Sequence, residues 1–321
     1  MPGGRNAVKP VVYALRALPG GIPDEVSSRV TLRGGGVRPA PRERVHEEAR
    51  DAEVLVVTYL DRVDEALLSG LPAVRQVSSY GVGLNHIELQ AVSRRGITLT
   101  NTPDVVTDAT ADLAMALLLA AARRVCEGDR LIRAGGWREA APEFLLGREV
   151  TGKTIGIVGF GRIGQAVARR AAGFGMRILY TSPREAGFPG ATRVDLDALL
   201  ATSDFVSLHC PLTDVTRDLI SRERIAQMKP GAILVNTSRG PVVDEEAVAE
   251  ALEDGRLFAA GLDVFRNEPQ VPERLRRAEN AVLTPHLGSG TRETRNAMAH
   301  MVWDEVLRRV TGRPPAHPVV I

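Results

Sequence analysis

The spacing of three glycines limits what this 321-residue chain can fold into. Gly159, Gly161 and Gly164 form the pattern G-x-G-x-x-G, after the apolar segment 155–158 and at the start of a segment that predicts a helix over 162–174. A strand, a tight turn and a helix in this order typically bind the pyrophosphate of a dinucleotide. The context predicts a dinucleotide-binding domain of the α/β class. A glycine-rich turn without a ligand is the alternative.

Each glycine of this turn has an expected task. Gly159 makes the tight turn, Gly161 lacks a Cβ so that the backbone can approach the pyrophosphate, and Gly164 lets helix and strand pack closely. The start of the helix then offers free N–H groups and a partial positive charge to the anion.

The rest of the chain alternates short apolar segments with helical ones. Strands are expected at 11–14, 54–57, 74–79, 97–100, 154–158, 177–180, 205–209, 232–236, 259–264 and 281–283. Helices are expected at 42–52, 108–124, 162–174, 195–201, 221–228, 244–254 and 291–310. This alternation predicts parallel sheets, and the length predicts about two domains. The helix at 108–124 is apolar nearly all round, so we expect it in a core.

Composition excludes several classes of protein. The 41 basic and 39 acidic residues give a net charge of +2, which provides no basic surface for a nucleic acid partner. Two cysteines, Cys126 and Cys210, exclude a disulfide framework and a zinc quartet, and no metal site is expected. The first ten residues lack the apolar segment of a signal peptide, and the longest apolar run, 114–122, is too short to cross a membrane. A cytoplasmic protein without a membrane partner is therefore expected.

The end of the strand at 177–180 bears on the choice of cofactor. An NAD-binding unit typically has Asp or Glu there for the ribose 2′-hydroxyl, whereas this chain has Thr181, Ser182 and Arg184. Two hydroxyls and a guanidinium suit a 2′-phosphate, which a carboxylate would repel. NADP(H) is therefore the preferred cofactor. If Arg184 is only a solvated loop residue, NAD(H) is used as well.

Three polar residues follow predicted strands in the second half. Arg239, Glu268 and His286 each come after a strand, at the edge where ligands bind in open α/β sheets. Each residue alone is commonplace, but together they suit the reduction of a 2-keto acid. Arg239 would grip the carboxylate and keto oxygen, His286 would donate a proton, and Glu268 would hold the imidazole and favour its charged form.

Several segments together resemble the D-isomer-specific 2-hydroxyacid dehydrogenases, and among them the NADPH-dependent glyoxylate/hydroxypyruvate reductases. The resemblance runs along nearly the whole chain. It is carried by SSYGVGLNHI at 78–87, TNTPD at 100–104, the turn at 159–164, CPLT at 210–213, and the segments 236–240, 263–269 and 284–289. It implies reduction of small 2-keto acids such as glyoxylate or hydroxypyruvate to D-2-hydroxy acids.

The resemblance also implies two Rossmann-like domains with parallel sheets. A flavodoxin-like substrate domain would comprise 1–101 and 288–321, and an NAD(P)-binding domain 102–287. The family's catalytic residues fall on Arg239, Glu268 and His286. Substrate would bind Val82, Gly83, Arg239 and His286, with glycines at 81 and 83 suiting a backbone nest for an anion.

The resemblance extends to the cofactor site and to assembly. The expected cofactor-binding residues are Thr110, Gly159, Phe160, Gly161, Arg162, Ile163, Gly164, Thr181, Ser182, Arg184, Cys210, Pro211, Thr216, Thr237, Ser238, Asp263 and Gly288. A homodimer is expected, with the helix after Asp108 contributing to its interface. The open alternatives are a hydroxyphenylpyruvate or other 2-keto acid reductase that uses NADH, and a nucleotide-sensing scaffold like the corepressors that share this fold.

Overall fold

The computed structural model describes residues 8–321, so the first seven residues of the expected substrate domain lie outside the described residues. The chain forms two compact units. Unit 1 comprises the described residues up to Val106 together with Thr291–Ile321, and unit 2 is Thr107–Gly290. No helix within residues 8–321 has both the length and the apolar character that crossing a membrane requires.

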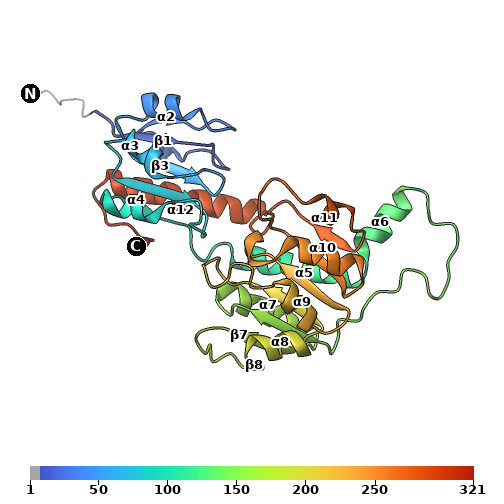
Figure 1. The fold of residues 1–321 in the computed structure, drawn as a ribbon. Helices are drawn as coiled ribbons and strands as arrows, with labels where there is room; N and C mark the ends of the chain where they lie inside the picture. Colours follow the sequence, from blue (N-terminus) through green and yellow to red (C-terminus); the bar gives the residue numbers. More distant parts are fainter. Residues whose placement is uncertain (1–7) are drawn as a thin grey trace, which may run out of the picture. The chain divides into compact units, whose positions relative to one another are not determined.

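Unit 1 is built on a five-stranded parallel sheet (Figure 1). Its strands are β1 (Val11–Ala14), β2 (Thr31–Gly34), β3 (Ala52–Thr58), β4 (Gln76–Tyr80) and β5 (Thr98–Thr100). Their spatial order is β2-β1-β3-β4-β5, with parallel pairing throughout. This is the flavodoxin-like order, so the predicted fold of this unit is confirmed.

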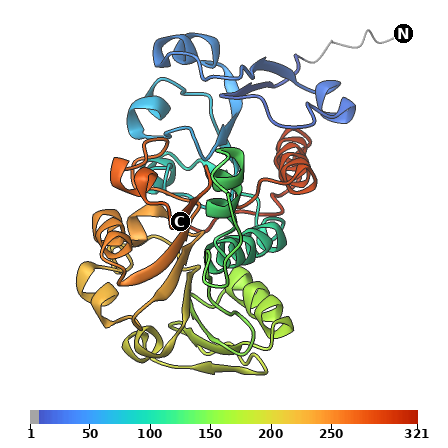
Figure 2. The ribbon, with the colours of Figure 1, turned by 90° about the vertical axis from the view of Figure 1, so that its right-hand side faces the viewer.

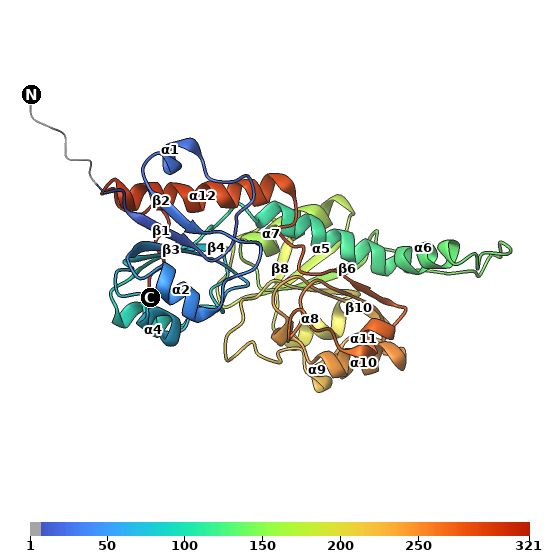
Figure 3. The same ribbon diagram turned by 90° about the horizontal axis from the view of Figure 1, so that it is seen from above.

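Helices cover both faces of that sheet. They are α1 (Asp24–Ser27), α2 (Arg42–Glu48), α3 (Glu65–Ser69), α4 (Leu89–Arg94) and α12 (Arg292–Val310). In Figure 3, α1 and α12 lie on one face and α2 and α4 on the other. Two apolar clusters match these layers: Val12, Val54 and Val56 pack with α12, whereas Val11 and Leu55 pack with α2, α3 and α4. Alternate residues of each strand thus enter opposite cores.

Unit 2 contains a seven-stranded parallel sheet. Its strands are β6 (Thr154–Val158), β7 (Arg177–Thr181), β8 (Ala191–Arg193), β9 (Phe205–Leu208), β10 (Ala232–Asn236), β11 (Leu257–Leu262) and β12 (Ala281–Leu283). Their order is β12-β11-β10-β9-β6-β7-β8. The order reverses between β6 and β9, which is the switch point at which doubly wound sheets bind dinucleotides. The predicted Rossmann-like class is confirmed here as well.

The helices of unit 2 also form two layers (Figures 2 and 3). They are α5 (Thr107–Ala122), α6 (Val125–Arg133), α7 (Arg162–Gly173), α8 (Leu196–Thr202), α9 (Arg222–Gln227), α10 (Glu245–Glu253) and α11 (Glu273–Arg277), with the short 3-10 helix η1 (Gly240–Val242). The α5 and α7 helices pack on one face, and α8 to α11 on the other. The predicted burial of the α5 segment is confirmed, because nine of its residues are buried.

One expected helix is shorter in the structure, and several elements were not predicted, among them the helices α1, α3, α4, α6 and α11. The helix predicted over 42–52 ends at Glu48, because Ala52 already starts the buried strand β3. The strands β2 and β8 were not predicted. Both are edge strands whose residues are mostly exposed, so they lack the apolar run that marks a strand in the sequence.

Candidate active site

Four strands of unit 2 deliver the candidate residues to one edge of its sheet. The strands β6, β10, β11 and β12 are parallel, and they end at Val158, Asn236, Leu262 and Leu283. The glycine turn and the segments that carry Arg239, Glu268 and His286 follow these ends. Since the carboxyl ends of parallel strands share one edge, the structure places these segments together, as expected.

Glu268 and His286 form a hydrogen-bonded pair. The Nδ1 atom of His286 lies 2.7 Å from Oε2 of Glu268, and Oε1 of Glu268 accepts a hydrogen bond from the Phe265 amide at 2.9 Å. The side chains of the pair are 28% and 29% exposed, so each is partly shielded while remaining open to a ligand. The pair leaves Nε2 of His286 as the ring nitrogen that does not face Glu268.

A buried carboxyl group shapes the loop that carries His286. Asp263 is fully buried and accepts hydrogen bonds from the Leu287 amide at 2.6 Å, the Gly288 amide at 2.8 Å and the Thr284 hydroxyl at 2.6 Å. His286 itself has φ +56°, in the left-handed region that side chains rarely adopt. The loop is therefore wrapped around Asp263, and this arrangement holds His286 in a costly backbone conformation.

Arg239 depends on two neighbours for its position. The side chain of Asn236 is buried, accepts from the amide and the hydroxyl of Ser238, and donates to the Arg239 carbonyl at 3.0 Å. A Cβ on Gly240 would overlap the backbone of Phe265. Glycine at 240 thus lets the Arg239 segment lie directly against the segment that leads to Glu268. Neither Asn236 nor Gly240 was predicted as a site residue.

Burial and charge act together on these groups. Burial lowers the pKa of Arg239, opposed by the charge of Glu268. Burial by itself raises the pKa of Glu268, but the hydrogen bond and charge of His286, with the Phe265 amide and Arg239, outweigh it, so the net pKa is lowered. Glu268 is therefore held as an anion, close to the guanidinium of Arg239 and hydrogen-bonded to the His286 ring. A guanidinium, a carboxylate and an imidazole at one edge can bind an acid and transfer a proton to it.

The glycine turn has the geometry expected of a phosphate site. Gly159 has φ +90°, and a Cβ there would lie 2.5 Å from the Cys210 nitrogen. A Cβ on Gly164 would overlap the Gly159 carbonyl oxygen. A Cβ on Gly161, by contrast, would meet no protein atom within 4 Å, and Gly161 provides no side-chain cap for α7. Packing requires the first and third glycines, whereas the second leaves open space at the N-terminus of the helix.

The other residues of this turn divide into buried and exposed ones. The ring of Phe160 is buried and stacks on Tyr180 with centroids 3.9 Å apart, so only its backbone is left to face a ligand. Arg162 is exposed and Ile163 is partly exposed at the start of α7.

The end of β7 carries the residues expected at the 2′-position of a cofactor. Thr181 is the last residue of β7, and Arg184 is exposed in the loop that follows. Arg193 of β8 donates to the Ser182 carbonyl at 2.9 and 3.2 Å and to the Pro183 carbonyl at 3.3 Å. This second arginine was not predicted, because the short exposed strand β8 has no apolar pattern that would reveal it.

His209, directly after β9, forms hydrogen bonds with residues at the ends of β9 and β10. The Nε2 atom of His209 lies 2.8 Å from the Ser207 hydroxyl, and its Nδ1 atom lies 3.4 Å from the Thr237 hydroxyl. Burial lowers the pKa of His209 to about 4, so it is neutral at neutral pH. Cys210 is buried beside it, and burial raises the pKa of its thiol to about 11.

The remaining predicted cofactor residues lie around the same edge. The Thr216 hydroxyl donates to the Pro211 carbonyl at 2.6 Å and closes the loop. Thr237 and Ser238 are buried after β10. A Cβ on Gly288 would lie 3.4 Å from the Thr110 hydroxyl and from Asp263, so these three residues are neighbours.

Val82 and Gly83, expected to bind substrate, belong to unit 1. They follow β4, at the carboxyl edge of its own sheet. Val82 is 41% exposed, and its backbone carbonyl accepts a hydrogen bond from the Asn101 side chain at 3.1 Å. Among residues 8–321 there is no group of three or more His, Cys, Asp or Glu side chains placed to hold a metal ion.

Comparisons with known proteins identify several relatives of this chain. The family model described as D-isomer specific 2-hydroxyacid dehydrogenase, NAD binding domain, matches residues 115–288. A glyoxylate reductase from Thermococcus litoralis is 47% identical over 287 residues, which cover 87% of each chain. A crystal structure of a protein from Thermus thermophilus has a TM-score of 0.92 and 44% identity, covering 97% of this chain and 100% of that one.

A third relative was solved with ligands. It is an NADPH-dependent glyoxylate/hydroxypyruvate reductase from Sinorhizobium meliloti in complex with NADP and malonate. Its structure has a TM-score of 0.85 and 32% identity, and the match covers 97% of both chains.

Proposed function

The chain belongs to the D-isomer-specific 2-hydroxyacid dehydrogenases, an oxidoreductase family with a nicotinamide cofactor, and on this basis we propose that it reduces small 2-keto acids to D-2-hydroxy acids. Glyoxylate and hydroxypyruvate are the proposed substrates, with NADPH as the preferred cofactor. The observation that carries the proposal is the Glu268–His286 pair, which lies with Arg239 at the sheet edge that also bears the glycine turn.

The proposed chemistry assigns one task to each residue of this group. When bound, the reduced nicotinamide supplies a hydride to C2 of the keto acid. Arg239 binds the substrate carboxylate and keto oxygen through its planar guanidinium. His286 donates the proton from Nε2 to the keto oxygen, which becomes the hydroxyl of the product. Glu268 holds Nδ1 and stabilises the charged imidazole before the transfer.

The residues of the glycine turn fit a dinucleotide. The uncapped start of α7 presents backbone N–H groups to an anion, and Gly161 keeps the space beside them free of side chains. The pyrophosphate would bind there, and the other residues proposed to contact the cofactor are Thr110, Cys210, Pro211, Thr216, Thr237, Ser238, Asp263 and Gly288. Their place around the same edge supports this assignment.

The preference for NADPH rests on the end of β7. Thr181, Ser182 and the exposed Arg184 stand where a carboxylate would be needed for NAD. Arg193 adds a second guanidinium to this loop, held against the Ser182 carbonyl. These two cations, with no carboxylate between the strand end and Arg184 and with Glu185 as the nearest acid, favour a 2′-phosphate.

We propose that unit 1 also binds the substrate. The turn at Val82 and Gly83 would bind the substrate carboxylate through backbone N–H groups. Unit 1 would thus be the substrate domain and unit 2 the cofactor domain.

We also propose a homodimer, formed through α6 and the segment after it. In Figures 1 and 3 this part stands apart from the rest of unit 2. Several of its apolar residues are exposed: Val125 by 56%, Ile132 by 61%, Trp137 by 57% and Leu146 by 58%. A second copy of the chain would cover them.

The double variant Ile132→Asp/Leu146→Asp should be monomeric in light scattering, whereas Val215→Asp, at an 84% exposed site elsewhere in unit 2, should remain dimeric. A dimer unchanged by the double substitution would contradict this interface.

The test of the activity is the loss of NADPH absorbance, and separately of NADH absorbance, with glyoxylate, hydroxypyruvate and a phenylpyruvate. Faster oxidation of NADPH with the two small acids is the expected result. Preference for the aryl acid would keep the chemistry and change the substrate, and faster oxidation of NADH would overturn the cofactor preference. No turnover with any pair would instead favour a nucleotide-sensing scaffold.

A further inference from the structure

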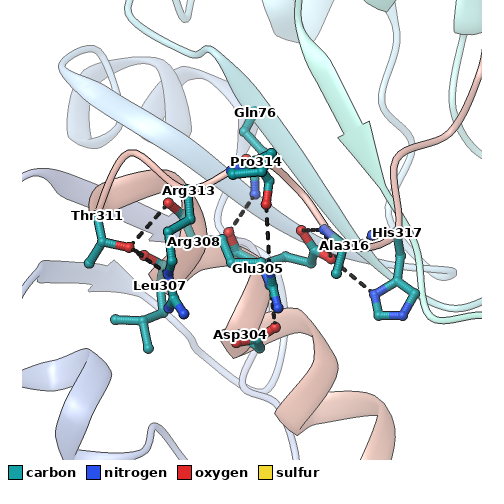
Figure 4. A network of polar contacts seen from close by, with 10 residues as sticks. All are labelled: Gln76, Asp304, Glu305, Leu307, Arg308, Thr311, Arg313, Pro314, Ala316 and His317. Carbon is teal, nitrogen blue, oxygen red and sulfur yellow. Dashed lines mark hydrogen bonds and ion pairs between the residues drawn. The ribbon is translucent and has the colours of Figure 1, made fainter.

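A buried carboxyl group in unit 1 holds the last segment of the chain. Glu305 of α12 is 1% exposed, and its Oε1 atom accepts hydrogen bonds from the Ala316 amide at 3.0 Å and the His317 amide at 2.8 Å (Figure 4). The Nδ1 atom of His317 lies 3.0 Å from the same oxygen. A buried carboxyl group is costly unless donors surround it, and here the donors come from residues 316 and 317. We call residues 314–319 the strap.

Further contacts hold Glu305 and the first residue of the strap in place. The Gln76 side chain of β4 donates to the Glu305 backbone carbonyl at 3.1 Å, and this bond joins α12 to the sheet next to Glu305. Arg308 forms an ion pair with Asp304 at 2.7 Å and donates to the Pro314 carbonyl at 3.4 Å, where the strap begins (Figure 4).

The strap then pairs with the edge strand β5. The Val319 amide donates to the Leu99 carbonyl at 2.8 Å, and Pro318 forms an antiparallel bridge with Thr100. The Asn101 amide donates to the His317 carbonyl at 3.4 Å. The strap therefore covers the backbone edge that β5 would otherwise expose, as far as the residue that follows this strand.

The residues after β5 hold the Val82 turn. The Asn101 side chain donates to the Val82 carbonyl at 3.1 Å, and the Thr102 amide donates to the Gly81 carbonyl at 3.2 Å. Asn101 thus has its backbone on the strap and its side chain on the turn. A continuous set of hydrogen bonds leads from the Glu305 carboxyl group to the Val82 carbonyl.

We propose that the strap is a positioning element for substrate, acting through Glu305 and Asn101 on the turn at Val82 and Gly83. The inference rests on the proposed function, in which this turn binds the substrate carboxylate. An anion nest works only when its N–H groups are held in one orientation, and the Asn101 bond fixes the carbonyl next to them. Loosening the strap should weaken substrate binding and leave the cofactor site of unit 2 unaffected.

Two single variants and their combination test the proposal. Asn101→Ala removes the bond to Val82, and Glu305→Gln keeps the side-chain volume but turns one acceptor oxygen into a donor that faces N–H groups. Each should raise the KM for glyoxylate about tenfold, the effect of losing roughly one hydrogen bond, with a smaller change in kcat. The double variant should raise it by much less than a hundredfold, because both act on the same turn. The Kd of NADPH, from fluorescence titration, should stay within about twofold.

The matched control is Asn280→Ala in unit 2. Asn280 also donates through its side chain to two backbone carbonyls, those of Leu252 and Phe258, at 3.2 and 3.1 Å. Its removal should lower Tm without raising the KM for glyoxylate. Folded Asn101→Ala and Glu305→Gln proteins with the KM of the unchanged chain would overturn the inference. So would additive effects in the double variant, because they would show that the residues act separately.

A second measurement does not depend on activity. Amide hydrogen exchange in a peptide that covers residues 80–86 should be faster in both variants than in the unchanged chain, and unaffected by Asn280→Ala. If the unchanged chain reduces no keto acid, the proposed function fails, while exchange still decides whether the strap holds the turn. Unchanged exchange in the variants would overturn the inference even with a fully active enzyme.

Discussion

The Nδ1 atom of His286 lies 2.7 Å from the Oε2 atom of Glu268, although 18 positions separate the two residues along the chain. Two neighbouring strands, β11 and β12, bring them together at one edge of the sheet. The contact fixes one ring nitrogen and turns the other, the proposed proton donor, away from Glu268. Substitutions at either residue should therefore affect proton transfer far more than cofactor binding.

His286→Ala should lower kcat for glyoxylate reduction at neutral pH by about 10²- to 10⁴-fold, because the proton donor is removed. Glu268→Gln should lower it by a smaller factor, since the imidazole keeps a hydrogen-bonding partner but loses the charge that stabilises its protonated form. The Kd of NADPH should be unchanged in both. An active His286→Ala enzyme would contradict the assignment.

Arg239→Ala should remove most activity and raise the KM for the keto acid, because the substrate carboxylate loses its planar partner. Arg239→Lys keeps the charge but not the fork, so it should recover only part of the loss. Steady-state kinetics with glyoxylate would measure both. Full recovery by lysine would show that charge alone is needed.

Gly240→Ala tests the close contact behind Arg239. The added Cβ would overlap the backbone of Phe265, so the segment must move, at a cost of about 1–3 kcal/mol in the free energy of unfolding. Because the movement takes Arg239 with it, KM should rise as well. Gly173→Ala in α7, where a Cβ meets nothing within 4 Å, is the control and should lower neither Tm nor activity. If Gly240→Ala were destabilised but kept its KM, the contact between Gly240 and Phe265 would not be what positions Arg239 for substrate.

Arg184→Ala should weaken NADPH binding much more than NADH binding, because only NADPH carries the 2′-phosphate. Arg177→Ala removes another exposed arginine, at the opposite end of β7, and should change neither. Fluorescence titration with both cofactors measures the difference. Equal losses for NADPH and NADH would refute the role of Arg184.

The low pKa of buried His209 predicts that the stability of the fold depends on pH. Its pKa in the folded chain is about 4, against 6.5 for an unperturbed histidine, so the unfolded chain binds a proton that the folded chain resists. The free energy of unfolding is therefore unaffected by His209 above pH 6.5. It decreases as the pH falls from 6.5 toward 4, by up to about 3 kcal/mol. His209→Gln should be less sensitive over this range in denaturant titrations. Parallel curves for the two proteins would contradict the prediction.

Much of the site follows from local patterns in the chain. The turn at 159–164 was recognisable because a strand and a helix flank its glycines. Close packing in the structure explains why Gly159 and Gly164 are glycines. Arg239, Glu268 and His286 were predicted together because each follows a strand, and all strands of unit 2 run parallel. The missed strands β2 and β8 lie at exposed sheet edges, where no apolar periodicity exists to reveal them.

The order of residues was enough to specify the alternation of strands and helices, the phosphate-binding turn and the residue types available for proton transfer. Which distant groups meet became known only from the folded chain: Asp263 with the amides of the His286 loop, Arg193 with the Ser182 carbonyl, and Glu305 with the strap. The difference arises because periodicity reports only which face of an element is buried. Hydrogen bonds between loops depend on strand order and on the path of each backbone, and neither leaves a local pattern in the chain.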